Sequence, residues 1–542
     1  MRLMNKLYLA IGIAMTTTML AGCGGSSGGG SSSNNNNNGV TPPAPQNTAP
    51  TWQAGQFLAS NQFANLCESP RSGIDPFENT PYPDAAGTAM HEKMWLRSFS
   101  NETYLWYDEI IDNDPNQFSS VAAYFAQLKT PLKTASGRDK DEFHFSESYE
   151  DFKKESQDGV SASFGITWTI PQSRMAYVAY IAANSPAAQA GIKRGDRLLK
   201  VGDLDFATFN SSNSAQYNQI ISAFSPAKDQ TVELTLLAQN GEQKQVSLTA
   251  LDLELEPVRN TQVIDFEGKR VGYMQFNQFI ASAQPGLISG FSQFNNLDEL
   301  VLDMRYNGGG LVFQASQVAY MIAGDQHNNR NFSVKTHNDK LSSQNEPLGF
   351  VDQSINWSTL TYNDDKLPAA NMKRVYMLTT GGTASASESV INALRGIDIE
   401  VILIGDDTRG KPYGFVPQQN CGTVYYTIQN KSANNKGFGD YEDGFIITPD
   451  TQLIGEIGLD AKVPGCQISD DFSKALGDQS EGLLAGALHH MTTGSCPVST
   501  ERAARATIQD TGSKDMHNDF NVPYHPLRHG AIFTPMQEPK HD

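Results

Sequence analysis

The sequence predicts an α/β fold, because apolar strands, glycine-containing turns and helical segments recur through its second half. Residues 299–305, 374–378 and 400–405 are short segments with the apolar content of buried strands. The first runs into the glycine-rich turn 306–310, and the other two lead to a serine-containing turn and a polar loop. In α/β folds the chemistry gathers at strand ends, so these turns are the first candidates for a functional site.

The serine and the lysine that follow these strands form a candidate hydrolytic pair. Ser385 lies in the run TASASE, and Lys411 ends the run TRGK. A serine hydroxyl becomes an effective nucleophile when a base takes its proton. A lysine can be that base if burial lowers its pKa from about 10.4 towards neutrality. The pattern is therefore compatible with a Ser–Lys dyad, with Ser387 as the competing nucleophile.

The same serine also fits a purely structural interpretation. Ser385 and Glu388 have the S-x-x-E spacing of a helix-capping box, and residues 389–395 follow with a helical pattern. Glu388 is therefore expected to shape the helix start rather than to transfer protons. The two interpretations are compatible, because free N–H groups at a helix start can stabilise negative charge on a substrate oxygen. The glycines at 308–310 would let further N–H groups approach a ligand, or form an ordinary flexible turn.

A second recognisable block lies upstream, over residues 163–203. Pro186 stands at the start of a short alanine-rich helix, Gly191 ends it, and Gly195 turns the chain into an apolar strand. Before it, Gly165 interrupts the entry of another apolar strand.

These blocks together resemble a known family. Residues 155–255 look like a PDZ domain, which binds peptide C-termini by β-augmentation. With the turn DMRYNGGG, the run SASE and the run TRGK, the chain resembles the C-terminal processing, or tail-specific, proteases over about residues 90–465. The resemblance implies a crotonase-like α/β core with Ser385 as nucleophile and Lys411 as general base. It also implies an oxyanion site at the N–H groups of Gly309 and Ala386, and peptide binding by Phe164, Gly165 and Ile166.

Three positions depart from the family pattern. Gly308 stands where a proline commonly precedes the glycine pair, and Phe415 stands where some members place a lysine-orienting glutamine. An aspartate sometimes found along the helix after the serine is also missing, since Arg395 and Gly396 stand there. Gln418 and Gln419 could reach the site only through a bulged loop. A third catalytic residue is therefore not assigned.

The first residues have the features of a bacterial lipoprotein signal. Arg2 and Lys6 precede an apolar stretch that is shorter than the roughly 20 residues a membrane span needs, which disfavours a retained membrane helix. The run LAGC resembles a lipobox and implies cleavage before Cys23 and attachment of lipid to its sulfur. Gly24 after the cysteine implies, by resemblance to sorting signals, delivery to the outer membrane facing the periplasm.

The remaining domains follow from composition and pattern. A tract rich in Gly, Ser and Asn after Cys23 cannot bury a core and predicts a flexible tether. A polar stretch at 325–365 is expected to be an inserted loop. The expected boundaries are a signal peptide at 1–22, a tether at 23–50, an N-terminal helical domain at 51–150, a PDZ-like domain at 155–255, a protease core at 256–465, and a C-terminal helical appendix with a polar tail at 466–542.

Charge and cysteine content limit which partners and which cellular compartment are compatible with the sequence. The 40 basic residues against 59 acidic ones leave a net charge of −19, which argues against nucleic acid as a partner. Cys67, Cys421, Cys466 and Cys496 are expected to form two disulfides, and three connectivities are open. The pair Cys466–Cys496 is favoured because it brackets a helical stretch. The cysteine and histidine spacings match no metal motif, so no metal or cofactor is expected.

Two functions from different classes are compatible with these observations. The first is a lipid-anchored periplasmic serine endopeptidase whose substrates are polypeptides with free C-termini, with any adaptor protein unidentified. The second is a catalytically inactive peptide-binding or chaperone-like lipoprotein on the same fold. The absence of G-x-S-x-G around Ser385 argues against an α/β-hydrolase elbow.

Overall fold

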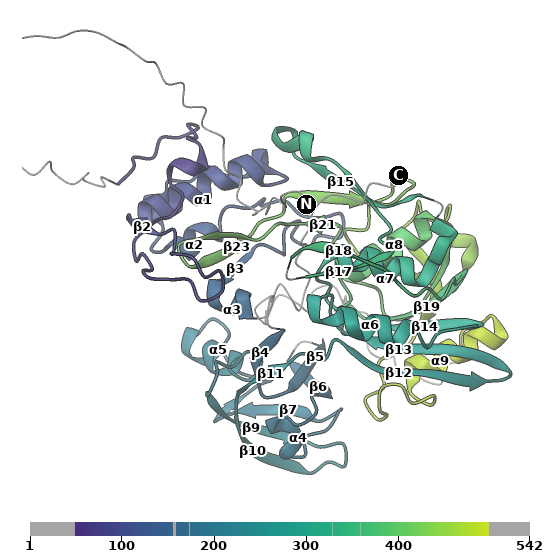
Figure 1. Ribbon diagram of the computed structural model, residues 1–542. Helices are drawn as coiled ribbons and strands as arrows, with labels where there is room; N and C mark the ends of the chain where they lie inside the picture. Colours follow the sequence, from purple (N-terminus) through teal and green to yellow (C-terminus); the bar gives the residue numbers. More distant parts are fainter. Residues whose placement is uncertain (1–48, 155–158, 173, 328, 358, 498–542) are drawn as a thin grey trace, which may run out of the picture. The chain divides into compact units, whose positions relative to one another are not determined.

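The computed structural model describes residues 49–154, 159–172, 174–327, 329–357 and 359–497 (Figure 1). The predicted signal peptide, Cys23 and the tether up to residue 48 lie outside the described residues, as does the polar tail from residue 498. Within the ranges that are described, no helix has both the length and the hydrophobicity of a membrane span.

A seven-stranded sheet lies at the centre of the largest hydrophobic core, with strand order β12-β13-β14-β19-β20-β26-β25. Every neighbouring pair is parallel except β12 with β13. The α/β prediction is confirmed, and the three predicted strands are the adjacent strands β14, β19 and β20. Because these strands are parallel, the turns that follow them meet at one edge of the sheet. The strands are β12 (Val258–Phe266), β13 (Lys269–Phe276), β14 (Glu299–Asp303), β19 (Arg374–Thr379), β20 (Glu400–Gly405), β25 (Ile446–Thr448) and β26 (Lys462–Gln467).

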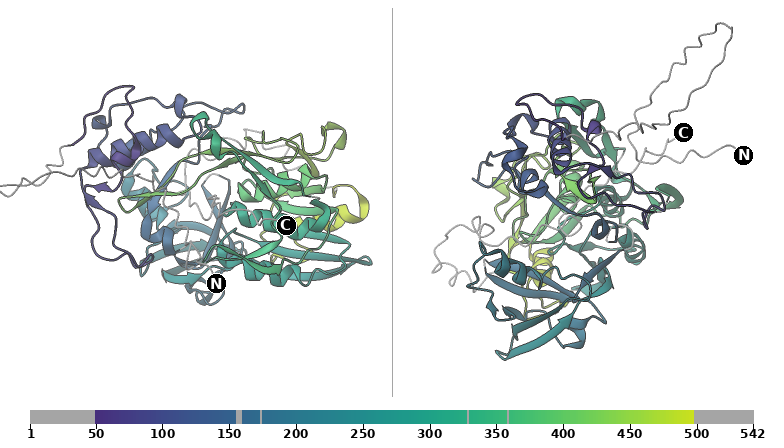
Figure 2. Two further views of the ribbon diagram at one scale, coloured as in Figure 1. Left: turned by 45° about the horizontal axis from the view of Figure 1, so that its top comes forward. Right: turned by 90° about the vertical axis from the view of Figure 1, so that its left-hand side faces the viewer.

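Helices cover both faces of this sheet, which explains why its central strands are apolar throughout. Leu300 and Leu302 of β14 pack in the core formed with α6 (Gln284–Phe291), α7 (Val312–Ala323) and α8 (Ala386–Gly396). Val301 points to the opposite face, where α9 (Gly482–Thr493) packs. In both views of Figure 2, α9, coloured yellow, lies beside the strands. The helical stretch predicted between Cys466 and Cys496 is therefore a layer of the core.

The N-terminal segment, which the sequence predicts to be a helical domain, contains helices together with short strands and shares its core with a later hairpin. Its helices are α1 (Ala89–Thr103) and α2 (Val121–Phe125). Trp95 of α1 and Phe125 of α2 pack against Tyr425 in β23 (Thr423–Tyr426). The short strand β3 (Phe145–Ser148) pairs antiparallel with β23, which in turn pairs with β22 (Gln418–Asn420). Figure 1 shows α1, α2, β3 and β23 side by side. The remaining strands of this segment are β1 (Leu66–Cys67) and β2 (Ala85–Ala86), and its last helix is α3 (Tyr149–Lys153).

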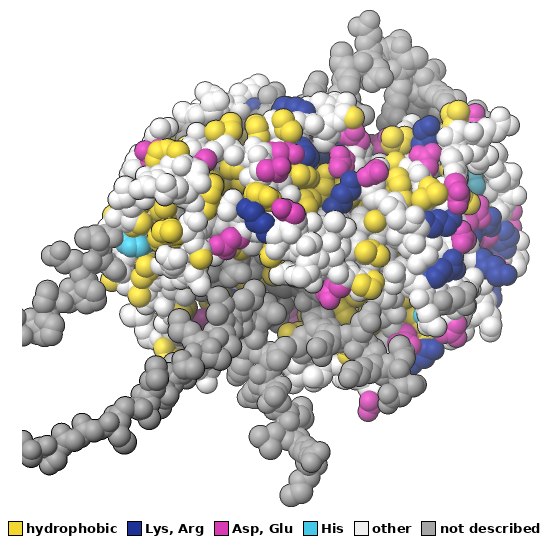
Figure 3. All heavy atoms as spheres, turned by 90° about the horizontal axis from the view of Figure 1, so that it is seen from above, with side chains coloured by type: hydrophobic (Ala, Val, Ile, Leu, Met, Phe, Trp, Pro, Cys, Tyr) yellow, Lys and Arg dark blue, Asp and Glu magenta, His cyan; other side chains and the backbone are white. Residues whose placement is uncertain are grey.

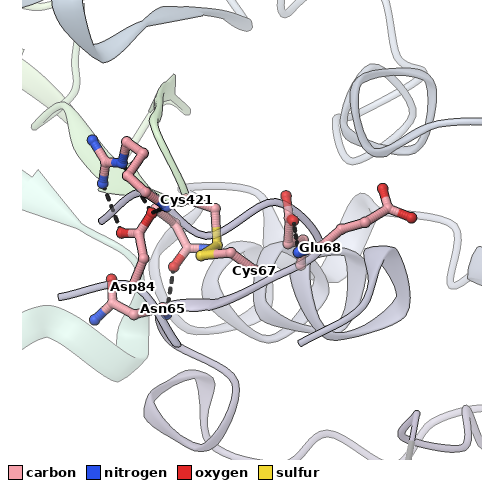
Figure 4. Close-up of a disulfide and its surroundings, with 8 residues drawn as sticks. Asn65, Cys67, Glu68, Asp84 and Cys421 are labelled. Atoms are coloured by element: carbon pink, nitrogen blue, oxygen red, sulfur yellow. Dashed lines mark hydrogen bonds and ion pairs between the residues drawn. A yellow bond between two sulfur atoms is a disulfide. The ribbon is translucent and has the colours of Figure 1, made fainter. Parts of the chain in front are cut away.

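Two disulfides tie distant parts of the chain together. The favoured pair Cys466–Cys496 is confirmed, and the second bond joins Cys67 to Cys421 across a sequence separation of 354 residues. Figure 4 shows this second bond at the turn between β22 and β23. Beside it, the Asn65 N–H donates to Asn420 Oδ1 at 2.8 Å. The bond therefore fastens the N-terminal segment to the hairpin with which it packs.

A β-rich unit with its own hydrophobic core lies between β4 (Val160–Ser163) and β11 (Leu251–Glu254), which pair with each other. Its sheet has the order β10-β9-β7-β6-β5, so β5 is an edge strand. Gly165 precedes β5 with φ +82°, and a Cβ there would lie 2.1 Å from Ser185 Cβ, so only glycine fits. The predicted helix starts at Pro186. The elements are β5 (Ile166–Gln172), β6 (Met175–Ile181), α4 (Pro186–Gln189), β7 (Arg197–Val201), β8 (Leu204–Asp205), α5 (Ser214–Ile221), β9 (Thr231–Leu237) and β10 (Gln243–Thr249).

The prediction of a loop at 325–365 is wrong, because this stretch contains several strands. β15 (Asn331–His337) pairs with β16 (Pro347–Gly349) and with β24 (Asn430–Ala433), which also pairs with β21 (Tyr413–Gly414). β17 (Gln353–Asn356) and β18 (Thr361–Lys366) form a hairpin. The polar composition concealed these strands, since the main partner of β15 lies about a hundred residues later.

Acidic and basic side chains are interspersed on the face shown in Figure 3, with no broad basic surface on that face.

Candidate active site

Ser385 lies directly before α8 in a backbone conformation that is costly for a residue other than glycine. Its φ is 56° and its ψ is −113°, and only 1% of its surface is exposed. Such conformations cluster at functional sites and persist only where the surroundings hold them. Part of that support is the predicted capping box, in which the Ser385 N–H donates to Glu388 Oε2 at 2.9 Å.

The glycine-rich turn after β14 packs directly against this serine. The main-chain oxygen of Asn307 accepts from the N–H of Ala384 at 3.2 Å and from Ser387 Oγ at 3.0 Å. Ser387 is fully buried with its hydroxyl donating to the turn, which gives it a structural role and disfavours it as the competing nucleophile.

Gly309 and Ala386, the expected oxyanion donors, are neighbours in space. A Cβ on Gly309 would lie 2.8 Å from Ser385 Cβ and 3.0 Å from Ala386 N, and the φ of Gly309 is +109°, so no other residue fits. The Gly309 N–H donates to Asn307 Oδ1 at 2.9 Å. Gly309 can therefore donate to a substrate oxygen only if this bond is exchanged or shared.

Glu388 connects the serine turn to the lysine loop. It is fully buried, and its carboxylate accepts four hydrogen bonds. Oε2 accepts from the N–H groups of Ser385 at 2.9 Å and Lys411 at 2.8 Å, and Oε1 accepts from the N–H of Gly410 and from Thr408 Oγ1, both at 2.6 Å. Burial raises the pKa of Glu388, and these hydrogen bonds oppose that rise. Glu388 therefore has two structural roles, because it caps the start of α8 as expected and also binds the loop that contains Lys411.

Lys411 is buried in an aromatic environment. Its side chain is 1% exposed, and Nζ lies 4.1 Å from the centre of the Phe415 ring and 5.0 Å from that of Phe143. Burial lowers the pKa of Lys411 well below its usual range, which the charges of Asp141 and Glu388 oppose and that of Arg409 reinforces. The direction of this pKa shift is the one that a lysine base requires. Phe415, which stands where some members of the resembled family have a lysine-orienting glutamine, thus packs against the amine.

Asp303 and Arg305 form the expected salt bridge at the end of β14, with Arg305 Nη2 2.9 Å from Asp303 Oδ2 and both side chains buried. The sequence did not indicate the further partners, Glu481 at 2.7 Å and Asp470 at 2.8 Å from Arg305 Nη1. Glu481 also caps α9, because its carboxylate accepts from the N–H of Leu484 at 3.2 Å. This ion cluster supports the backbone just before the glycine-rich turn.

Replacing Glu481 by glutamine is expected to lower the free energy of unfolding by about 2 kcal/mol, because it weakens charge-assisted bonds to Arg305 in a buried cluster. Urea unfolding followed by circular dichroism measures the change. Glu456→Gln is the matched control, since the Glu456 side chain is 70% exposed and should contribute little. Equal stability of the two variants would show that the buried cluster adds nothing.

The expected peptide-binding residues belong to the β-rich unit rather than to this site. Phe164 and Ile166 are buried in its core, and the Gly165 N–H donates to Ser163 Oγ at 2.9 Å. From the same unit, Arg194 donates to Tyr306 Oη at 2.6 Å and pairs with Asp470 at 2.7 Å. Tyr306 precedes the glycine-rich turn, so this contact joins the β-rich unit to the site.

The described residues contain no group of three His, Cys, Asp or Glu side chains arranged to hold a metal ion.

Comparison with known proteins agrees with this geometry. Residues 270–453 match the sequence model of peptidase family S41. Carboxyl-terminal-processing proteases of Picosynechococcus sp. and Synechocystis sp. are each 26% identical to the chain, over 230 and 232 residues. Each alignment covers 42% of this chain and 48% of the relative, so the chain spans about half the length of the curated relatives it matches.

A crystal structure from Bacteroides fragilis NCTC 9343, described as that of an S41 protease, has a similar fold. Its TM-score is 0.52 at 23% identity, covering 76% of this chain and 97% of that one. The family match spans the glycine-rich turn, Ser385, Glu388 and Lys411. Residues 270–453 are therefore similar to the peptidase domain of family S41, and part of the chain is similar to the carboxyl-terminal-processing proteases.

Proposed function

We propose that this protein is a lipid-anchored periplasmic serine endopeptidase that uses a Ser–Lys dyad and recognises substrates through their C-termini. The observation that carries the proposal is Glu388, whose carboxylate binds the N–H groups of both Ser385 and Lys411. A structural helix cap would need only the first of these bonds. The second joins the backbone of buried Lys411 to the carboxylate that also binds Ser385, whose backbone is strained, and this supports a pairing of the two residues.

In the proposed reaction, uncharged Lys411 accepts the hydroxyl proton as Ser385 attacks the peptide carbonyl. The N–H of Ala386, at the start of α8, and that of Gly309, released from Asn307 Oδ1, stabilise the oxyanion. The Lys411 ammonium then gives its proton to the leaving amine as the C–N bond breaks. A water molecule, deprotonated by Lys411, hydrolyses the acyl-enzyme and restores the serine hydroxyl.

Substrate recognition is assigned to the β-rich unit, which we interpret as a PDZ-like domain beside a crotonase-like core. Its edge strand β5 has the free backbone edge that β-augmentation needs. Phe164, Gly165 and Ile166 would bind the C-terminal end of the peptide there. The contact of Arg194 with Tyr306 and Asp470 supports a functional connection between this domain and the serine turn.

The compartment follows from two independent features. The run ending at Cys23 resembles a lipobox, and two disulfides join Cys67 to Cys421 and Cys466 to Cys496. Disulfides persist in oxidising compartments, which include the bacterial periplasm. Lipid on Cys23 would then hold the folded part at a membrane facing that compartment.

The proposal is tested by incubating the full-length protein, purified in detergent, with an unfolded protein that is labelled at its N-terminus and has a free C-terminus. Cleavage is expected, and Ser385→Ala is expected to reduce its rate by at least about a thousandfold, whereas a folded Ser387→Ala variant retains a measurable rate. Blocking the substrate's C-terminus as an amide should slow cleavage. Binding of the substrate without cleavage would favour the peptide-binding alternative, and full activity of Ser385→Ala would exclude the assigned nucleophile.

A further inference from the structure

The pocket of Lys411 is completed by a segment more than 250 residues earlier in the chain. Residues 138–143, which we call the clasp segment, lie against the lysine loop. Arg138 Nη1 donates to the main-chain oxygen of Arg409 at 2.8 Å. Arg138 also pairs with Glu142 at 2.9 Å, and Arg409 pairs with the same carboxylate. The clasp segment is thus fastened to the residues immediately before Lys411.

Asp141 occupies the centre of this segment and is fully buried. Its Oδ1 accepts from the N–H of Phe143 at 2.9 Å, and its Oδ2 accepts from Tyr104 Oη at 2.7 Å. The first bond sets the turn that presents the Phe143 ring to Lys411 Nζ. The second anchors the carboxylate to the C-terminal end of α1, where Tyr104 Oη also accepts from the N–H of Thr130 at 3.1 Å.

The charged and titratable groups around this pair come from four parts of the chain. Three charged side chains act on Lys411. Asp141 comes from the clasp segment, Glu388 from α8, and Arg409 from the loop that holds Lys411. His144 Nδ1 lies 3.8 Å from Asp141 Oδ2, and burial lowers the pKa of His144 to about 4. Lys129 Nζ donates to the main-chain oxygen of Asp141 at 3.0 Å.

We propose that Asp141 is a positioning residue for the general base, which it holds in place through Phe143 and whose ammonium form it stabilises when Lys411 takes the Ser385 proton. This inference rests on the proposed Ser–Lys mechanism. It makes the N-terminal segment part of the catalytic centre, with the Cys67–Cys421 bond fastening that segment to the hairpin beside it. It also accounts for a working base without the lysine-orienting glutamine, because Asp141 and Phe143 restrain the amine instead.

The sign of the expected pH effect follows from the charges. Lys411 must be neutral to act, so activity is lost as the pH falls through the pKa of Lys411. Asp141 opposes the lowering of that pKa by burial. Asp141→Asn is therefore expected to lower the pKa of Lys411 further, which makes Lys411 a weaker base. The acid limb of the kcat/KM profile should then move to lower pH by about one unit.

The test compares pH profiles of kcat/KM for the full-length protein, Asp141→Asn and Asp325→Asn. We expect the Asp141 variant to lose about tenfold in kcat and to shift its acid limb downward. Asp325 is the matched control, because it lies outside the clasp segment with a side chain that is 84% exposed and should leave the profile unchanged. An unshifted limb and an unchanged kcat in a folded Asp141→Asn protein would overturn the inference.

A second variant covers the case in which Asp141→Asn does not fold. Tyr104→Phe removes one hydrogen bond to Asp141 but keeps its charge, so kcat should fall severalfold while the acid limb stays in place. Wild-type kcat in this variant would overturn the positioning role. If the wild-type protein does not cleave, or Lys411→Met keeps its activity, the proposed function fails instead, and the two failures are thereby distinguished.

Discussion

Replacing Lys411 by methionine is expected to reduce kcat/KM by at least about a thousandfold, because the serine hydroxyl then has no base to take its proton. The same change should leave the thermal unfolding midpoint unchanged or raise it. Lys411 is buried against the rings of Phe143 and Phe415, and an apolar side chain of similar length avoids the cost of desolvating an amine. Cleavage assays and thermal melts of the same preparation measure the two quantities.

A second buried lysine provides the control for this variant. Lys335 is 6% exposed in β15, and burial also lowers its pKa, but it pairs with Glu346 away from the serine turn. Lys335→Met should therefore keep most of the cleavage rate. A Lys411→Met protein that cleaves at more than about a tenth of the wild-type rate would show that another group removes the serine proton.

Replacing Glu388 by glutamine is expected to lower both activity and stability. The carboxylate accepts bonds from Ser385, Thr408, Gly410 and Lys411, whereas an amide has one acceptor oxygen and turns donor hydrogens towards the other two donors. Each buried donor left unpaired costs about 1–3 kcal/mol. We expect a loss of about 3 kcal/mol in unfolding free energy and of about a hundredfold or more in kcat, since the lysine loop is no longer held to the serine turn.

The control variant Glu299→Gln separates the loss of stability from the loss of activity. Glu299 is also buried and pairs with Arg374 and Lys269, but it lies at the amino end of β14, at the edge of the sheet opposite to the serine. This variant should lose stability and keep its kcat below the unfolding transition. If Glu388→Gln behaves in the same way, Glu388 acts only as a helix cap, whose loss typically costs about 1 kcal/mol.

Local patterns predicted the parts of the site that depend on neighbouring residues. Three short apolar strands lead to the glycine-rich turn, to Ser385 and to the lysine loop. Their continuous apolar sequences predict strands that are buried on both faces of a sheet. The S-x-x-E spacing predicted the bond from Ser385 to Glu388 because both residues belong to one helical turn. The helix between Cys466 and Cys496 followed from the same kind of local signal, and so did their disulfide.

Long-range contacts could not be predicted from the sequence, because hydrogen bonds between distant segments leave no periodic pattern in either segment. The strand β15 reads as a polar loop until its partner β24 is known. The role of Glu481 at Arg305 joins residues 176 positions apart, and neither local pattern indicates it.

The sequence by itself determined the α/β core and the start of α8 at Ser385, because each depends on a few consecutive side chains and their backbone freedom. Tertiary structure alone decided that Glu388 binds the lysine loop as well as the serine, and that Asp141 and Phe143 enclose Lys411. Burial and neighbouring charge set whether a lysine can be a base, and both are properties of the folded chain.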